Sequence, residues 1–148
     1  MVKLDQIIHT IELPDGISHS IEGDTLTISK DGSQISRAFR HSRISISASG
    51  NSLEVHCALP RRREKALSGT WAAHIRNMVK GVDIGFTYRL KAVYSHFPMT
   101  IKVQGNQMSI TNLFGEKVPR IAPLPWSPDD VKVEVKNKVD VIVSGADI

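Results

Sequence analysis

The side chains with the greatest chemical potential are six histidines, one cysteine and fifteen carboxylates, in a chain of 148 residues. No two histidines have the HExxH spacing of a zinc site, and Cys57 has no second cysteine to join it as a ligand or in a disulfide. Cys57 ends a predicted strand, where a buried structural thiol is expected rather than a nucleophile. Asp129 and Asp130 are adjacent but lie in a proline-rich loop. We therefore predict no catalytic site, no metal site and no cofactor.

The basic side chains are distributed unevenly along the chain. Residues 33–102 hold twelve Lys or Arg and three acids, a net charge of +9, whereas the remaining residues carry −5. A basic stretch of this size predicts a polyanionic partner such as nucleic acid, because cations near phosphates release condensed counterions. A well-solvated basic surface is the alternative. With one cysteine and no apolar run long enough to span a bilayer, we expect a reduced, cytoplasmic location and no membrane partner.

Two basic clusters are candidates for binding. Arg61, Arg62 and Arg63 open a predicted helix, where cations oppose the helix dipole, so RNA phosphate could offset the cost. A flexible, solvated arginine run is the alternative. Lys136 and Lys138, with Lys132, alternate with valines and are predicted to share the outward face of a strand. A charged edge that prevents aggregation is the other explanation of these lysines.

The elements that would position these side chains follow from the hydrophobic pattern. Alternating apolar residues around turn residues predict one hairpin near residues 17–28 and another near residues 44–57. Residues 67–79 have apolar side chains at helical spacing, which predicts an amphipathic helix of about four turns with Gly81 as its stop. Trp71 is expected in the core, and Trp126 is expected to cap a sheet rather than to stack on a base. Residues 84–95 alternate like a strand and are expected to link two halves.

The second half of the chain repeats the first. Residues 21–28 align with residues 103–110 at an offset of 82, and residues 53–57 align with residues 139–143 at an offset of 86. We therefore predict an α+β fold with two tandem repeats of a small antiparallel-rich sheet and one helix, at residues 1–82 and 83–148. The counterpart of the helix would begin near position 150, so the second repeat is expected to lack it. Either the chain is a C-terminally short form of a longer one, or a partner covers the open sheet face.

Three segments resemble a known family. Residues 68–82, residues 85–98 (Gly-Phe-Thr-Tyr-Arg-Leu, then Val-Tyr-Ser-His-Phe-Pro) and residues 112–120 (Asn-Leu-Phe-Gly-Glu-Lys-Val-Pro-Arg) resemble the archaeal and eukaryotic branch of the sixth large-subunit ribosomal protein family. The end of the chain, Asp140–Gly145, is also similar to the second-domain motifs of that family. The likeness covers nearly the whole chain, although the family continues beyond the position of Asp147 into a further helix and a basic tail.

The resemblance implies two tandem α/β domains and no catalysis. It implies a structural role in the large ribosomal subunit, bound to rRNA near the sarcin–ricin loop and the stalk base, beside neighbouring ribosomal proteins and translation factors. Lys117 and Arg120 fall on the loop motif of the family and are candidate RNA contacts, whereas Arg61, Arg62 and Arg63 rest on charge alone. The alternative function is a protein-interaction module whose open sheet face binds a protein partner.

Overall fold

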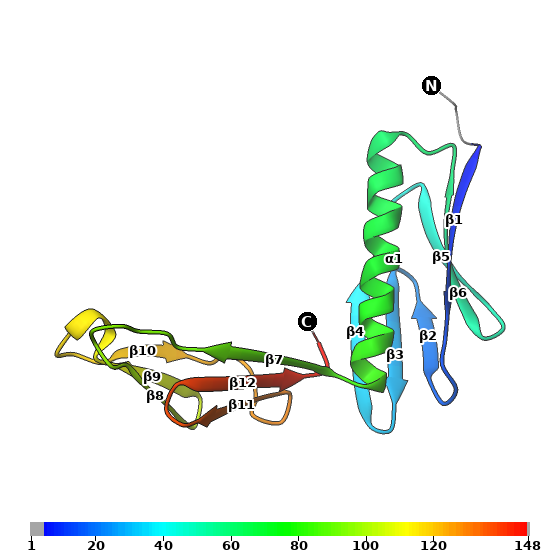
Figure 1. The fold of residues 1–148 in the computed structure, drawn as a ribbon. Coiled ribbons are helices and arrows are strands. Elements are labelled where there is room, and N and C mark those ends of the chain that lie inside the picture. Colours follow the sequence, from blue (N-terminus) through cyan, green and yellow to red (C-terminus); the bar gives the residue numbers. More distant parts are fainter. Residues whose placement is uncertain (1–4, 148) are drawn as a thin grey trace. The chain divides into compact units, whose positions relative to one another are not determined.

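The computed structural model describes residues 5–147 (Figure 1). These residues form two compact units, which we call unit 1, up to Ile84 together with Asp147, and unit 2, Gly85–Ala146. Among the described residues, no helix has the length and apolar composition needed to cross a bilayer.

Unit 1 contains six strands followed by a helix in the described part of the chain: β1 (Gln6–Glu12), β2 (Ser18–Glu22), β3 (Thr25–Lys30), β4 (Ser33–Ala38), β5 (Ile44–Ser49), β6 (Ser52–Ala58) and α1 (Arg62–Asp83). The strands form two antiparallel sheets, with the orders β1-β6-β5 and β2-β3-β4. Both hairpins predicted from the sequence are present. A further strand, β1, precedes the first of them.

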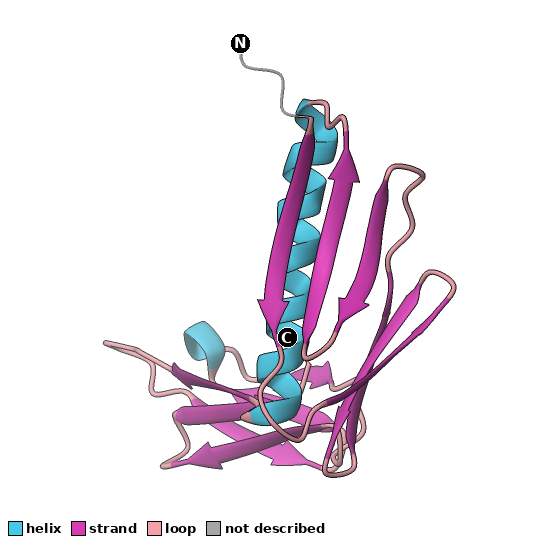
Figure 2. Cartoon of the chain, turned by 90° about the vertical axis from the view of Figure 1, so that its right-hand side faces the viewer, coloured by secondary structure: helices cyan, strands magenta, loops and turns pink. Residues whose placement is uncertain are grey.

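Helix α1 covers both sheets of unit 1, packing on β1, β6, β3 and β4 (Figure 2). Its buried side chains Trp71, Ile75 and Met78 recur every three or four residues and so lie on one face. They meet the inward residues of the strands, among them Leu26 and Val55, which are fully or almost fully buried. The single helix therefore closes the core of unit 1.

The predicted helix is shorter than the observed one. α1 has 22 residues, about six turns, because its first turns carry the basic cluster and lack the apolar spacing that marks the rest. Gly81 does not stop it, since this glycine is buried within the last turn. The helix ends at Asp83 with Ile84 as its C-cap, and Gly85 follows with φ +77°, the left-handed conformation that glycine commonly adopts after a helix.

Unit 2 contains six strands and a short 3₁₀ turn: β7 (Phe86–Lys91), β8 (Thr100–Gln104), β9 (Gln107–Thr111), η1 (Leu113–Gly115), β10 (Arg120–Pro123), β11 (Val131–Lys136) and β12 (Asp140–Gly145). They form two antiparallel sheets with the orders β7-β12-β11 and β8-β9-β10. The segment predicted to link the halves, residues 84–95, contains strand β7, which is shorter than the expected strand. β7 is an edge strand of unit 2, since it pairs with β12 along its whole length.

The two units have the same strand order. Replacing each strand of unit 1 by the strand six places later reproduces both sheets of unit 2. The matched hairpins also share their turns: Glu22 pairs with Thr25 around Gly23, and Gln104 pairs with Gln107 around a glycine 82 residues later. Both glycines have a positive φ, +59° and +56°. The predicted α+β class, with two sheet repeats of which the second has no helix among its described residues, is confirmed.

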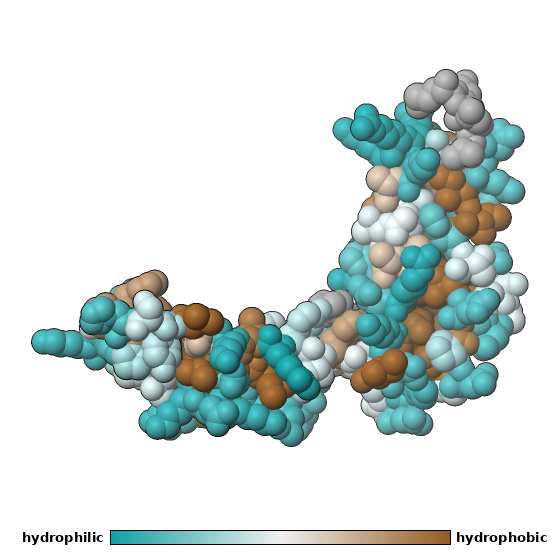
Figure 3. All heavy atoms as spheres, in the orientation of Figure 1, coloured by the Kyte–Doolittle hydropathy of each residue, from teal (hydrophilic) through white to brown (hydrophobic). Residues whose placement is uncertain are grey.

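The missing helix changes the core of unit 2. In the described residues, nineteen hydrophobic side chains are buried, and only Ile101 and Val141 belong to unit 2. One face of sheet β7-β12-β11 is apolar, and we call it the open face; its residues are Tyr88, Leu90, Val133, Val135, Val141 and Val143. Tyr88 and Leu90 are 50% and 58% exposed. Figure 3 accordingly shows apolar residues at the surface of unit 2, between polar ones.

Candidate nucleic-acid interface

The loop between β9 and β10 carries the two candidate RNA contacts that match the family motif. Arg120 opens β10, and its guanidinium forms two hydrogen bonds with the Glu116 carboxylate, Nε to Oε2 and Nη2 to Oε1, both 2.7 Å. The hydrogen bond from Arg120 lowers the pKa of Glu116. Lys117 lies between them in the sequence and is exposed. The bidentate pair fixes the orientation of Arg120.

Two contacts join this loop to the loop between β7 and β8. The Asn112 side chain donates a hydrogen bond from Nδ2 to the Pro98 carbonyl oxygen, at 3.0 Å. The Phe97 ring lies so close to Gly115 that a Cβ on this glycine would be 2.9 Å from the ring. Asn112, Phe114 and Gly115 all have left-handed backbone conformations, with φ of +61°, +51° and +79°. These contacts hold the two loops together, so they form one structured surface of unit 2 rather than two independent segments.

The arginine run lies in unit 1, at the start of α1. Arg61 is the N-cap residue, and Arg62 and Arg63 are the first two residues of the helix; all three are exposed. The Glu64 side chain accepts a hydrogen bond from the Arg61 backbone N–H, 3.0 Å from N to Oε2. Hydrogen bonding to its own backbone N–H, and then to that of Arg61, lowers the pKa of Glu64. This carboxylate offsets part of the cost of placing cations at the positive end of the helix dipole.

The last two candidates occupy a turn of unit 2. Lys136 is the final residue of β11 and pairs with Asp140 across the sheet. Lys138 is in the turn between β11 and β12 with φ +63°, so the prediction that it shares a strand face with Lys132 is wrong. The apolar–basic alternation continues past the end of the strand and so hides the turn. Both side chains are exposed, and the Lys138 backbone carbonyl accepts a hydrogen bond from the Ile101 N–H, at 2.8 Å.

The seven candidate residues are divided between the two units. Arg61, Arg62 and Arg63 belong to unit 1, and the four others lie in or next to two different loops of unit 2. The basic stretch at residues 33–102 likewise crosses the boundary between the units. Of the described residues, unit 1 has ten Lys or Arg and ten acids, with Asp147 included, and unit 2 has eight Lys or Arg and five acids. Unit 2, with a net charge of +3, is the more basic unit.

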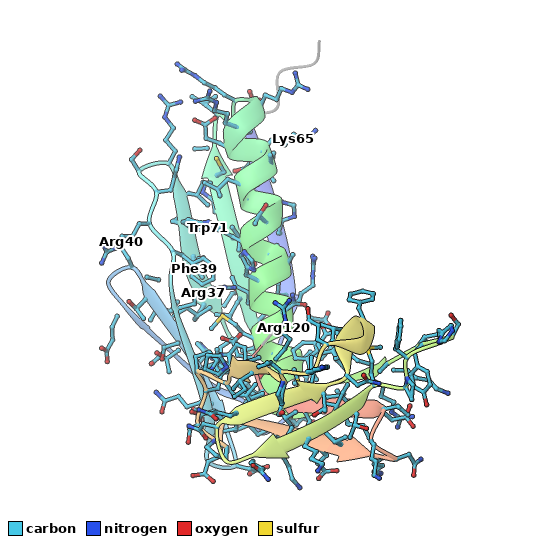
Figure 4. The ribbon with its side chains drawn as sticks, turned by 90° about the vertical axis from the view of Figure 1, so that its left-hand side faces the viewer. Arg37, Phe39, Arg40, Lys65, Trp71 and Arg120 are labelled. Atoms are coloured by element: carbon cyan, nitrogen blue, oxygen red, sulfur yellow. The ribbon has the colours of Figure 1, made fainter. Side chains whose placement is uncertain are left out.

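A cleft in unit 1 was not predicted from the sequence. It has a volume of about 810 Å³ and lies between the β2–β3 turn and strand β5. Trp71 lies at the cleft and packs on Phe39, with ring centroids 5.2 Å apart (Figure 4). Arg43 and Arg61 line it as well. The expected core position of Trp71 is correct, since the side chain is 6% exposed.

The exposure of several aromatic side chains in unit 2 was not predicted from the sequence. Phe114 is 83% exposed, Phe97 47% and Tyr94 46%. The sequence feature that could have indicated an exposed ring is Phe114, which precedes a glycine in a proline-rich loop where apolar and polar residues no longer alternate. Trp126 is 54% exposed beside Leu124 and Val131, and its expected role as a cap of the sheet stays a prediction.

No group of three or more histidine, cysteine, aspartate or glutamate side chains is arranged to hold a metal ion in residues 5–147. Burial raises the pKa of the Cys57 thiol, which opposes nucleophilic reactivity. The exposed cations among the candidate residues lie at strand ends, in loops and at the start of α1.

Comparison with known proteins gives the family. The model of the ribosomal protein L6 family matches residues 13–85. The large ribosomal subunit protein uL6 of Methanosphaera stadtmanae is 45% identical over 145 residues, which cover 98% of this chain and 77% of the relative. The proteins of the same name from Aeropyrum pernix and Nanoarchaeum equitans are 42% and 36% identical, over 100% and 99% of this chain and 80% and 77% of theirs.

In class, the chain is a two-unit α+β protein with exposed basic loops that is similar over nearly its whole length to large ribosomal subunit proteins. The chain belongs to the ribosomal protein L6 family, whose members are structural and not enzymes.

Proposed function

We propose that this chain is a cytoplasmic structural constituent of the large ribosomal subunit that binds and braces rRNA. The observation that carries the proposal is the 36–45% identity to proteins named large ribosomal subunit protein, over nearly the entire chain. The +3 charge of unit 2 and its exposed basic loops support an anionic partner.

The more specific part of the proposal concerns place and contacts. The resemblance of residues 112–120 to the family loop motif supports a position near the sarcin–ricin loop and the stalk base, where neighbouring ribosomal proteins and translation factors are close. Lys117 and Arg120 are the proposed phosphate contacts in that loop. Lys136 and Lys138 are proposed as a second set in unit 2, and Arg61, Arg62 and Arg63 as a third in unit 1.

The binding mechanism is phosphate neutralisation by side chains held on rigid elements. Because the Glu116 carboxylate holds Arg120 in place, its guanidinium meets the RNA with little loss of conformational freedom. RNA is then recognised by its folded shape, since cations on sheet ends reach the backbone rather than base edges.

The test is co-sedimentation of the purified chain with large subunits that lack this protein, at several salt concentrations. We expect binding that weakens steeply as salt rises. The double variant K117A/R120A should bind more weakly, with a log–log salt slope smaller by roughly 0.7–0.9 for each lost phosphate contact. The control is K132A, since Lys132 is exposed in the same unit but paired with Glu134 at 2.8 Å and is not a proposed contact. Salt-independent association would contradict the proposal.

A protein-interaction module is the second candidate, and the open face favours it. Tyr88 and Leu90 are exposed there, whereas the equivalent face of unit 1 is covered by α1. This function predicts self-association or precipitation that added RNA does not relieve, and binding to large subunits that does not change in K117A/R120A.

A further inference from the structure

The two joined loops of unit 2 present aromatic side chains to solvent. We call this end the aromatic tip, defined by Tyr94 and Phe97 of the β7–β8 loop and Phe114 of the β9–β10 loop. Aromatic side chains usually lie in cores, because burying their large apolar area is favourable. Three of them, each 46–83% exposed on adjoining loops, indicate a surface that meets a partner.

The tip is built to hold Phe114 away from the sheet. Gly115 lets the Phe97 ring lie against the backbone directly after Phe114, since any side chain there would meet the ring at 2.9 Å. The hydrogen bond from Asn112 to Pro98 fixes the residues before it. Phe114 itself has φ +51°, a conformation that non-glycine residues rarely adopt and that is concentrated at functional sites. The backbone thus accepts strain while the ring stays 83% exposed.

The charges around the tip favour an anionic partner such as nucleic acid over a basic or purely apolar one. Glu116, the acid of the β9–β10 loop, is neutralised by Arg120 through the bidentate pair. Lys117, three residues after Phe114, is exposed and adds a positive charge. An exposed aromatic ring and a cation in one loop can bind an unpaired nucleotide, since the ring can stack on the base while the cation contacts the phosphate.

We propose that Phe114 stacks on one unpaired RNA base, with Lys117 at an adjacent phosphate. This inference rests on the proposed rRNA-binding function and adds to it the kind of nucleotide that the loop binds: a base outside a helix, since a ring cannot stack on a base enclosed in a duplex. Binding at the tip is then stacking as well as phosphate neutralisation.

The test uses large subunits that lack the protein and are rebuilt with the full chain or its variants. The flexibility of each rRNA nucleotide is probed with a ribose-acylating reagent, at protein concentrations that give equal occupancy. With F114A, we expect one or a few unpaired nucleotides to become more reactive, and the affinity for subunits to fall by roughly tenfold, as for loss of one stacked base. F114W should restore both readouts, whereas F114L, which is apolar but not aromatic, should restore neither.

The matched control is V118A, because Val118 is 74% exposed in the same loop and has no ring. It should leave reactivities and affinity as in the unchanged chain. Unaltered reactivity with F114A at equal occupancy would overturn the stacking while leaving the proposed function in place. Full recovery by F114L would overturn it in favour of an apolar contact with a protein. If the unchanged chain does not bind the subunits, the proposed function and this inference fail together.

Discussion

Gly115 and Gly105 have the same backbone requirement but different surroundings. Both have positive φ, +79° and +56°, and both follow strands of the β8-β9-β10 sheet. Only Gly115 has a ring against it; a Cβ at Gly105 would meet nothing within 4 Å. At the scale of single residues, the tip of unit 2 therefore depends on a contact that the residue type alone does not reveal.

Substitution of these two glycines separates strain from contact. G105A should destabilise the chain by about 1 kcal/mol, the cost of a left-handed conformation for alanine. G115A carries that cost and must also displace the Phe97 ring, so we expect a loss of about 2–3 kcal/mol. Urea unfolding of both variants measures the difference, and equal losses would show that the ring moves freely.

Cys57 gives a pH-dependent prediction. Burial raises the pKa of its thiol, so the folded chain keeps it neutral at a pH where the unfolded chain ionises. Stability from this residue is therefore complete below the unfolded pKa of about 8.5 and is lost as pH rises above it. Iodoacetamide at pH 8 should alkylate the native chain slowly and the urea-unfolded chain fast. Similar rates in the two states would contradict the burial of this side chain.

Helix α1 is the element on which unit 1 depends. It supplies six of the seventeen buried hydrophobic side chains of this unit among the described residues, and its long axis crosses both sheets. Lys30, from β3, and Asp83, at the helix end, form an ion pair that also joins the two layers. The hydrogen bond from Lys30 to Asp83 raises the pKa of the lysine.

Truncating the buried face of α1 should destabilise unit 1. Ile75 is fully buried, and I75A should cost about 2–5 kcal/mol through lost burial and the cavity left behind. The neighbouring exposed residue is the control, with R76A expected to change stability by less than about 0.5 kcal/mol. Urea unfolding is followed by tryptophan fluorescence in chains that also carry W126F, so that the emission comes from Trp71 and reports on this unit. A loss below 1 kcal/mol for I75A would show that the core relaxes around the cavity.

At the scale of the whole molecule, the two units share a strand order but not a core. Positions that α1 covers in unit 1, such as Val55, have counterparts such as Val141 in unit 2, where no helix is present among the described residues. Neighbouring strands cover part of the open face, because Val141 is only 5% exposed, but Leu90 is 58% exposed. The prediction that a partner or a further segment covers this face stays a prediction.

The open face should bind apolar probes. L90S should lower the fluorescence of the dye ANS bound to the full chain, since it removes an exposed leucine from a contiguous apolar surface. The control is I84S, because Ile84 is 79% exposed at the end of α1 and is not part of that face. Equal effects of the two variants would show that the dye reports scattered apolar residues rather than the open face.

The sequence by itself determined the class of fold, both hairpins of unit 1, the amphipathic helix and the repetition of the sheets. These features follow from the spacing of apolar residues and from turn residues, such as Gly23 and Gly105. Both signals are local, since they depend only on residues that are close in the sequence. The family could also be identified from the sequence, because its motifs at residues 85–98 and 112–120 are each made of consecutive residues. The candidate cations could be named for the same reason, although nothing in the sequence ranked them.

Only the tertiary structure decided where helix α1 starts and stops, that Lys138 is in a turn, and that Arg120 is held by Glu116. It also decided that the Phe97 ring lies on Gly115 while Phe114 is left exposed. These outcomes depend on contacts between segments that meet only after folding, so the spacing along the chain does not encode them. Periodicity identifies which side chains share a face, but packing decides which faces are covered and which remain available to a partner.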